Sequence, residues 1–420
     1  IFASTNQKNM FEMKKFIGKI IQKWRAFLLP QRVKQVDTEM KQANGSTRKL
    51  QRFLSQQFEF RYNRLTGVTE YRPKETDADF RPIDEREMNG MIVDARLKGI
   101  ACWNNMVPTL VLSNKVESYN PFQDYLEKLP AWDGIDRVTP FLQRVSDDEL
   151  WLKGGRYWMR AMTAQWMGVP REHANVLVPV LVSSQQGWGK STFCRQILPE
   201  SLRAYYVDNL NLAPGGSPEK KLVKMGLINL DEFDKISEKR QPDLKNLLQM
   251  MSVPVYRGKR LGYVTEPRLA SFIATTNSRE LLCDPTGSRR FICVEVTRMI
   301  PEEPIAYDQL YAQLKQEVLE GERDYLNKEE EKEVQRRNKA YYRQSPLEDV
   351  FHACYRHPEA DEEGDWLTAS EIFRLMNKRN ASALRGISAK QLSYRLTAMG
   401  FKPRHTMRGN CYHVVLEEAA

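Results

Sequence analysis

The stretch VLVPVLVSSQQGWGKSTF, residues 176–193, decides the fold of this chain. Its first half is apolar and rich in β-branched residues, which predicts a buried strand. A short polar segment follows and closes on Gly187, Gly189, Lys190 and Ser191. A helix-compatible stretch comes next. Strand, glycine-containing loop and helix start in this order predict a phosphate-binding P-loop.

The residue types in this loop suit a nucleoside triphosphate and its metal. Backbone N–H groups of such a loop point at phosphate oxygens, and the helix start adds positive potential. We expect Lys190 to reach the β- and γ-phosphates and the Ser191 hydroxyl to ligate Mg²⁺. The residues expected to contact the nucleotide are Gln186, Gly187, Trp188, Gly189, Lys190, Ser191 and Thr192.

One position departs from the usual pattern. The first glycine of G-x-x-x-x-G-K-[ST] falls on Ser184. A Cβ at the turn entry narrows the allowed backbone, so we expect a slightly different loop there.

Two further strand-like runs end in polar residues that would complete the site. Residues 226–232 read GLINLDE, so that Asp231 can hold the Mg²⁺ and Glu232 can polarise the attacking water. Residues 269–276 read LASFIATT and end at Asn277, whose amide can orient water against the γ-phosphate. Ligands bind at the carboxyl ends of strands in open α/β sheets. The competing interpretations are a strand end with solvated acids and an ordinary turn asparagine.

Adjacent arginines follow the turn at residues 284–288. Arg289 or Arg290 could stabilise transition-state charge on a neighbouring subunit's γ-phosphate. The alternative is a salt bridge within the subunit, and the sequence does not distinguish the two arginines.

A basic turn lies between the acids and the asparagine. Residues 253–264 read VPVYRGKRLGYV, which predicts a hairpin with Arg257, Lys259 and Arg260 near its tip. In a ring-shaped assembly these side chains could grip DNA phosphates without reading sequence. The alternative is a solvated loop.

These motifs together resemble a known family. The short spacing from Lys190 to Asp231 and from Glu232 to Asn277 resembles that of superfamily 3 helicases. More closely, QGWGKST, LDE, TTN and GSRRF, at residues 186–192, 230–232, 275–277 and 287–291, resemble the virulence-associated protein E family. The resemblance implies an ATP-driven replicative helicase or replication initiator of a mobile genetic element. It also implies a ring oligomer, commonly a hexamer, often downstream of a primase module.

Strands and helices alternate from residue 176 to residue 297, so the expected class is α/β with a P-loop NTPase core of the AAA+ or superfamily 3 kind. A hairpin is expected over residues 58–71 and helices over 84–97, 121–129, 148–167 and 307–343, the last with a solvated run at Glu329-Glu330-Glu331. The expected divisions are a basic amphipathic helix and linker (1–50), an α+β region (51–147), the ATPase domain (148–300), a helical connector (301–344) and a winged-helix-like domain (345–420).

The C-terminal region has a DNA-binding pattern. Helix starts at Leu367 and Ser388 precede a strand, a turn and a strand, which suggests a winged helix. No acidic residue occurs between residues 372 and 413. The side chains expected to meet DNA phosphates are Lys390 and Arg395 on the last helix and Lys402, Arg404 and Arg408 on the wing. The alternative use of such a domain is subunit contact.

Composition narrows the class of protein and of partner. The formal net charge is +10 and the isoelectric point about 9.1, which favours a polyanionic partner such as DNA. Six cysteines without C-x-x-C pairing indicate reduced thiols, and we find neither a signal peptide nor a membrane-spanning run, so a cytoplasmic location is expected. The amphipathic helix at residues 10–29 could dock on the chain's own core, a neighbouring subunit or a membrane surface. The chain starts at Ile1, so we expect a missing upstream module.

Three functions remain open at this stage. The first is an ATP- and Mg²⁺-dependent hydrolase that moves along or remodels DNA. The second is a DNA-binding assembly module that uses ATP as a switch without unwinding, for replication control or phage interference. The third is a P-loop kinase, which lacks a recognisable acceptor-binding lid.

Overall fold

The structure is a computed structural model that describes residues 45–76, 78–213, 215–237, 240–258, 262–283, 285–343, 346–359 and 362–417. The chain divides into two compact units, Ile1–Pro121 and Phe122–Ala420. The expected amphipathic helix at residues 10–29 and the basic residues Lys259 and Arg260 lie outside the described residues. In the part of the chain that is described, no helix has both the length and the apolar character needed to cross a membrane.

The first unit is a small α+β structure. Its sheet has the strand order β3-β2-β1-β4. The strands are β1 (Phe58–Asn63), β2 (Val68–Pro73), β3 (Arg81–Pro82) and β4 (Ser118–Tyr119), and the helices are residues 45–57, α2 (Glu85–Leu97) and α3 (Met106–Val111). β1 and β2 form the expected hairpin, with Asn63 closing its turn by accepting from the N–H of Leu65 at 3.0 Å. The expected helix at residues 84–97 is confirmed as α2, capped by Asp84.

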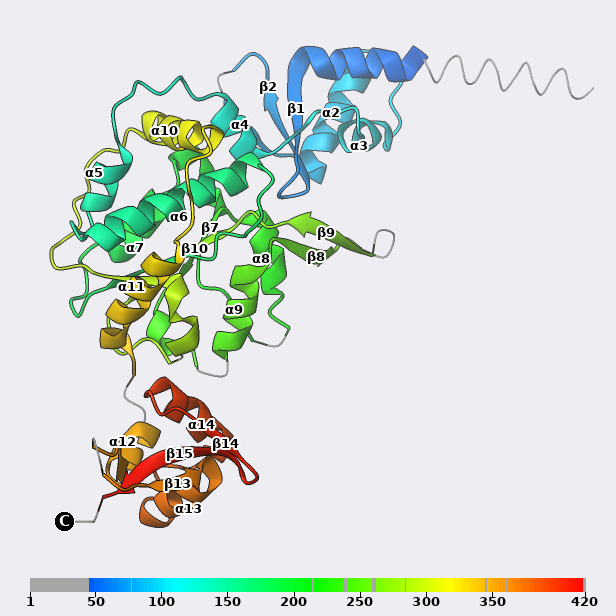
Figure 1. The fold of residues 1–420 in the computed structure, drawn as a ribbon. Coiled ribbons are helices and arrows are strands. Elements are labelled where there is room, and N and C mark those ends of the chain that lie inside the picture. The colour runs from blue at the N-terminus through cyan, green and yellow to red at the C-terminus, as the bar shows by residue number, and fades with distance from the viewer. Residues whose placement is uncertain are drawn as a thin grey trace, which may run out of the picture. The chain divides into compact units, whose positions relative to one another are not determined.

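The second unit contains the predicted α/β sheet, which is entirely parallel (Figure 1). The strand order is β11-β5-β10-β7-β6. The strands of the sheet are β5 (Val178–Val182), β6 (Tyr206–Asp208), β7 (Leu227–Leu230), β10 (Ser271–Thr276) and β11 (Phe291–Glu295). The helices of this part are α4 (Pro121–Glu127), α5 (Val138–Gln143), α6 (Glu149–Met167), α7 (Lys190–Gln196), α8 (Pro218–Lys224), α9 (Gln241–Gln249), α10 (Tyr307–Leu319) and α11 (Lys328–Asn338).

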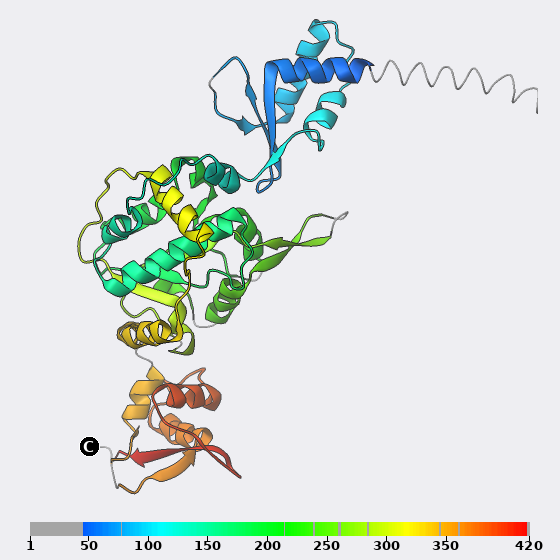
Figure 2. The same cartoon turned by 45° about the horizontal axis from the view of Figure 1, so that its top comes forward.

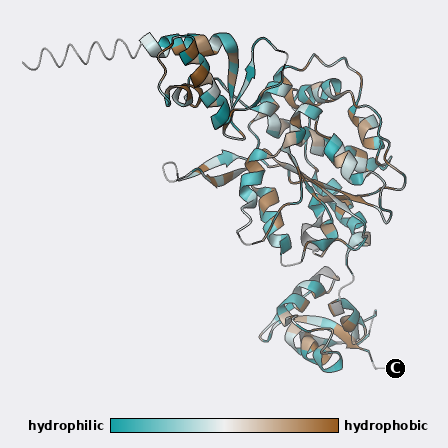
Figure 3. Ribbon diagram, turned by 180° about the vertical axis from the view of Figure 1, so that it is seen from behind, coloured by the Kyte–Doolittle hydropathy of each residue, from teal (hydrophilic) through white to brown (hydrophobic). Residues whose placement is uncertain are grey.

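Helices cover both faces of this sheet, and every residue of β5, β7 and β10 is buried. Most of these residues are apolar, and brown, hydrophobic ribbon runs through the middle of the unit in Figure 3. On one face, alternate residues of β5 pack with Leu222 of α8 and Leu248 of α9 in a single core. On the other face α6 lies close to β11, because a Cβ on Gly154 would stand 2.5 Å from the Ile292 side chain. Asp148 caps the start of α6, and Gly168 ends it in a left-handed conformation. The expected helix at residues 148–167 is confirmed.

The boundary between the units lies upstream of the one expected near residue 147. Phe122 is fully buried, with its ring centroid 4.7 Å from that of Trp166, and it fills the space beside Gly226, where a Cβ would collide with it. Gln123 also donates to the carbonyl of Met167 at 3.2 Å. Residues 122–147 therefore pack as part of the sheet-containing unit.

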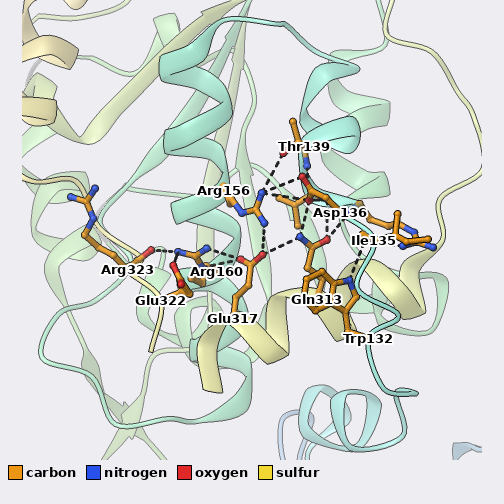
Figure 4. A network of polar contacts seen from close by, with 12 residues as sticks. Trp132, Ile135, Asp136, Thr139, Arg156, Arg160, Gln313, Glu317, Glu322 and Arg323 are labelled. Atoms are coloured by element: carbon orange, nitrogen blue, oxygen red, sulfur yellow. Dashed lines mark hydrogen bonds and ion pairs between the residues drawn. The ribbon is translucent and has the colours of Figure 1, made fainter. Parts of the chain in front are cut away.

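A buried charge network ties the helices of one face together (Figure 4). Glu317 of α10 accepts from Arg156 at 2.5 Å and from Arg160 at 2.7 Å, both on α6. Gln313 bridges Glu317 to Asp136 in the loop before α5, with distances of 3.0 and 2.7 Å. Glu317 and Arg160 are 5% and 4% exposed, so the pairing compensates the cost of burying their charges.

The helical stretch expected over residues 307–343 is interrupted. α10 ends before Gly321, which is left-handed at φ 75°, and α11 begins after Asn327, which caps it. The prediction of a solvated acidic run there is wrong for Glu330, which is 9% exposed and pairs with Lys153 at 2.6 Å and Arg323 at 2.9 Å. α11 packs against the segment leading into β11, so it belongs to the body of the unit.

The β8–β9 hairpin, β8 (Ser252–Tyr256) paired antiparallel with β9 (Tyr263–Pro267), is confirmed. Figure 2 shows it projecting from the parallel sheet and its helices. At its base the buried Arg268 donates to the carbonyls of Leu248 and Ala270, which joins the hairpin to α9 and to the approach to β10.

Residues 346–417 have a core of their own. The elements are α12 (Pro346–His352), β12 (Tyr355–Arg356), β13 (Asp365–Thr368), α13 (Ala369–Arg379), α14 (Ala389–Ala398), β14 (Arg404–Thr406) and β15 (Gly409–Leu416). Capping boxes at Thr368 and Ser388 start α13 and α14, at or one residue beyond the expected positions. β13 and β14 both pair with β15, and β12 and β13 were not expected from the sequence.

Candidate functional site

The loop between β5 and α7 holds two glycines in conformations that other residues rarely adopt. Gly187 has φ 77°, and Gly189, which precedes the first residue of α7, has φ 81°. Ser184 is not among the residues with positive φ, so this position does not need the conformational freedom of glycine. The turn around Ser184 is held by Ser183, whose hydroxyl accepts from the N–H of Gln185 at 3.1 Å.

The sequence-predicted residues of three strand ends line one cavity of about 330 Å³. Because β5, β10 and β7 are adjacent and parallel, their carboxyl ends meet at the same edge of the sheet. The loop contributes Gln186, Gly187, Trp188, Gly189, Lys190, Ser191 and Thr192, while Asp231, Glu232 and Asn277 come from the other two strand ends. Thr275, Thr276 and Glu302 complete the lining.

Lys190 points to the end of the middle strand. Its ammonium donates to Asn277 Oδ1 at 2.9 Å and to the carbonyl of Gln185 at 3.2 Å. The side chain is buried, which lowers the pKa of Lys190, while the negative charge of Asp231 opposes that shift. The lysine and the asparagine are therefore within direct reach of each other and of the cavity.

The two threonines at the end of β10 hold two of the acids that follow β7. Thr275 donates its hydroxyl hydrogen bond to Asp231, and Thr276 donates to Asp234 Oδ1 at 2.5 Å. Sequence analysis gave no role to Thr275 and Thr276, although both belong to the TTN motif, and it did not identify Asp234. The available signal was a pair of polar residues closing an otherwise apolar strand immediately before Asn277.

Glu232 lies between these anchored acids in a strained conformation. Its backbone is left-handed, with φ 52° and ψ 47°, which costs a residue with a side chain of the order of 1–3 kcal/mol. Its carboxylate is half exposed and lies 2.5 Å from Lys235 Nζ. Strain of this kind often accompanies a functional position.

The donor set of the cavity suits Mg²⁺. The Ser191 hydroxyl and the Asp231 carboxylate are hard oxygen donors, which this cation prefers, and it commonly takes only one or two protein ligands beside substrate phosphates. Within the described residues, no group of three or more His, Cys, Asp or Glu side chains is arranged to hold a metal ion without a substrate.

The two candidate arginines differ in accessibility. They end the 3₁₀ segment Pro285–Arg290, and neither is in the lining of the cavity. Arg289 is exposed and pairs with Glu331 at 3.1 Å, whereas Arg290 is 9% exposed. Of the two, Arg289 is the more accessible to another molecule.

The residues expected to bind DNA also fall into two groups. Lys390, Lys402, Arg404 and Arg408 are exposed. Arg395 instead has a side chain 15% exposed and pairs with Glu348 of α12 at 3.3 Å, which contradicts its expected place on an open phosphate-binding face. On the β8–β9 hairpin, Arg257 pairs with Glu266 at 2.5 Å.

The family comparison decides the classification. Residues 126–343, just over half of the chain, match the virulence-associated protein E-like domain. The chain belongs to this family. Within the virulence-associated protein E-like domain lie the whole parallel sheet and every residue that lines the cavity.

Other comparisons cover the remaining regions more loosely. Residues 344–414 match a domain of unknown function described from B. theta, DUF3874. Three apo structures of the NrS-1 C-terminal region align over 88% of this chain and over 98%, 99% and 99% of their own, with 11%, 11% and 13% identity and a TM-score of 0.41 each. A superposition of that quality does not by itself define a shared fold. No curated protein matches the sequence.

Proposed function

We propose that this chain is a P-loop ATPase that acts on DNA as a helicase or replication initiator of a mobile genetic element. The observation that carries the proposal is the single cavity lined by the loop after β5, the acids after β7 and the asparagine after β10. A triphosphate site needs phosphate-binding donors, metal-binding oxygens and a water-positioning group in one place, and these strand ends supply all three.

Each residue then has a defined role toward MgATP. The backbone N–H groups of the loop and Lys190 bind the phosphates, and leaving Asn277 for a phosphate costs Lys190 one hydrogen bond. Ser191 and Asp231 hold the metal, which neutralises charge on the phosphates when it is bound. Glu232 accepts a proton from the attacking water, and Asn277 orients that water.

The proposed assembly is a ring, commonly a hexamer in relatives of this kind, with ATP between subunits. Arg289 would reach the neighbouring γ-phosphate after leaving Glu331, an exposed ion pair that costs little to break. Arg290 is buried and would support this segment from within. Hydrolysis should be recovered when subunits carrying Arg289→Ala are mixed with subunits carrying Lys190→Ala. Some interfaces of the mixed ring then combine an intact Lys190 with an intact Arg289.

A winged-helix assignment for residues 346–417 supports the DNA part of the proposal. The order α12-β12-β13-α13-α14-β14-β15, with β13 and β14 on either side of β15, is compatible with a helix-turn-helix unit followed by a wing. Lys390 and Tyr394 are on the exposed face of α14, and Arg404 and Arg408 extend along the wing. Such cations add phosphate contacts that do not depend on base sequence.

The decisive experiment is ATP hydrolysis with and without DNA. Lys190→Ala should abolish hydrolysis, while Lys220→Ala, which removes an exposed lysine outside the cavity, should leave it unchanged. DNA-stimulated hydrolysis that persists in Lys190→Ala would refute the site. Strand displacement on a forked duplex then separates a helicase from an ATP-driven switch, since a switch hydrolyses ATP but displaces no strand of either polarity.

A further inference from the structure

One acid in the cavity is not explained by phosphate or metal binding. Glu302 lines the cavity with the loop, Asp231 and Glu232. Asp231 accepts from Thr275, and Glu232 pairs with Lys235. Among the residues that the structure describes, none donates a hydrogen bond to the Glu302 carboxylate or forms an ion pair with it. This carboxylate is free to accept hydrogen bonds from a ligand.

The backbone around Glu302 is anchored on both sides. The N–H of Ile300 donates to the carbonyl of Trp188 in the loop at 3.1 Å. Arg144 of the second unit donates to the carbonyls of Glu303 and Pro304 at 2.8 and 3.0 Å. The backbone on either side of Glu302 is therefore held beside the loop, and the residue is part of the cavity lining.

The sheet order and the contact of Ile300 with the loop together indicate which part of a nucleotide Glu302 can meet. Glu302 follows β11, and β11 and β10 flank β5 on opposite sides, with β7 beyond β10. Ile300, two residues before Glu302, lies against this loop, because its N–H donates to the carbonyl of Trp188 at 3.1 Å and a Cβ on Gly189 would stand 3.6 Å from the Ile300 side chain. Glu302 thus joins the cavity from the segment after β11, whereas the groups proposed for the metal and the γ-phosphate come from the ends of β7 and β10. A nucleotide with its terminal phosphate toward Glu232 has its nucleoside toward the β11 side.

Charge points to the same part of the ligand. A carboxylate beside a phosphate repels it, so Glu302 would weaken the binding of a bare triphosphate. The vicinal hydroxyls of ribose are two donors side by side, and a carboxylate offers two acceptor oxygens. Hydrogen bonds to an ionised group are also among the stronger ones.

We infer that Glu302 accepts hydrogen bonds from the ribose hydroxyls of the bound nucleotide and so selects ribonucleoside triphosphates. The inference rests on the proposed function, because it assumes that the phosphates occupy the loop. It adds a specificity residue from the segment after β11 to the groups on β5, β7 and β10.

The test compares ligands that keep or lack the groups concerned. Calorimetric titration of the full chain uses MgATP, Mg-2′-deoxyATP, MgGTP and magnesium tripolyphosphate. Wild type should prefer ATP over 2′-deoxyATP by about tenfold, the value of one hydrogen bond to a charged acceptor. Glu302→Ala should remove that preference and weaken ATP about tenfold or more, yet bind tripolyphosphate at least as tightly as wild type.

Two variants keep the result interpretable. Glu303→Gln removes the same charge from the neighbouring residue, which is not in the cavity lining, and should behave like wild type. Glu302→Gln retains the shape of the side chain and one acceptor, so it should lie between wild type and Glu302→Ala even where the alanine variant folds poorly.

Different results would contradict the ribose contact and the proposed function. Equal weakening of ATP and tripolyphosphate in Glu302→Ala would overturn the inference, because the residue would then act through the phosphates or the fold. A changed ratio of ATP to GTP with an unchanged ratio of ATP to 2′-deoxyATP would assign Glu302 to the base and overturn the ribose contact. Failure of wild type to bind any of the nucleotides would instead refute the proposed function.

Discussion

Two acidic residues of the second unit, Glu317 and Glu232, differ in how completely hydrogen bonds and ion pairs satisfy their charges. Glu317, in the network joining α6 and α10, is 5% exposed and accepts from two arginines and a glutamine. Glu232, at the edge of the sheet, has a side chain 55% exposed, a left-handed backbone and an ion pair with Lys235. Removing one partner from a satisfied buried charge network destabilises the fold, whereas an accessible, strained charge is available for a ligand.

The strongest test of this contrast is Glu232→Gln. If Glu232 is the proton acceptor, hydrolysis should fall about 10²–10⁴-fold, while ATP binding and the melting temperature stay the same. Steady-state hydrolysis, nucleotide titration and thermal unfolding measure the three quantities. Glu200→Gln, an exposed acid outside the cavity, is the matched control. Unchanged hydrolysis would remove Glu232 from the chemistry.

The opposite pattern is expected for Glu317→Gln. Loss of this carboxylate leaves Arg156 and Arg160 without their shared buried partner, so the unit should lose about 3–5 kcal/mol of stability. Thermal and urea unfolding measure the loss, and hydrolysis per folded molecule should be retained. Glu320→Gln, which changes an exposed acid at the C-terminal end of α10, should change stability little. Equal effects of the two variants would show that the network is not a stabilising element.

Acid should weaken this network selectively. Burial alone would raise the pKa of Asp136, but hydrogen bonds from Thr139 and Gln313 and the charge of Arg156 lower it to about 2. Burial likewise acts to raise the pKa of Glu317, and Arg156 and Arg160 lower it overall. These pKa values lie below those of the unfolded chain, so the stabilisation is present above about pH 4 and is lost as the pH falls through the folded-state values.

The measurable consequence is a pH-dependent melting temperature. Between about pH 4 and pH 2, the melting temperature of wild type should fall more steeply than that of Glu317→Gln, which has already lost one titrating group. Parallel curves for the two proteins would contradict the assignment of these pKa shifts to the network.

The same contrast between an accessible and a paired charge applies to two cationic side chains on α14, where the expected effects are the smallest. Lys390 is exposed, whereas Arg395 pairs with Glu348. Lys390→Ala should reduce the slope of log affinity for DNA against log salt by about one unit, as expected for one lost phosphate contact. Arg395→Ala should leave the slope unchanged and lower the melting temperature of the C-terminal region. The reverse result would place Arg395 at the DNA.

Local signals in the sequence predicted much of this structure. The apolar run before Ser183 became β5, and the side chains of Asp148, Thr368 and Ser388 cap the helices that follow them. Strand ends were predictable because apolar runs stop at polar residues. Parallel pairing then brought Asp231 and Asn277 into the same cavity as the loop.

What the sequence did not predict depends on contacts between distant residues. Glu330 pairs with Lys153, which comes from the distant α6, and with Arg323, seven residues before it, and no periodicity in an acidic helix indicates these contacts. Phe122 joins the second unit through its fit against Gly226, which is far away along the chain. No sequence motif marks Glu302, because its place in the cavity lining depends on the hydrogen bond that joins Ile300 to the loop.

The left-handed backbone of Glu232 has a consequence for engineering the thermal stability of this protein. Glycine at position 232 would relieve an unfavourable conformation that costs about 1–3 kcal/mol. Replacing this glutamate by glycine should therefore raise the free energy of unfolding while removing the carboxylate. A screen for thermal stability alone should therefore favour Glu232→Gly, although this substitution removes the proposed proton acceptor.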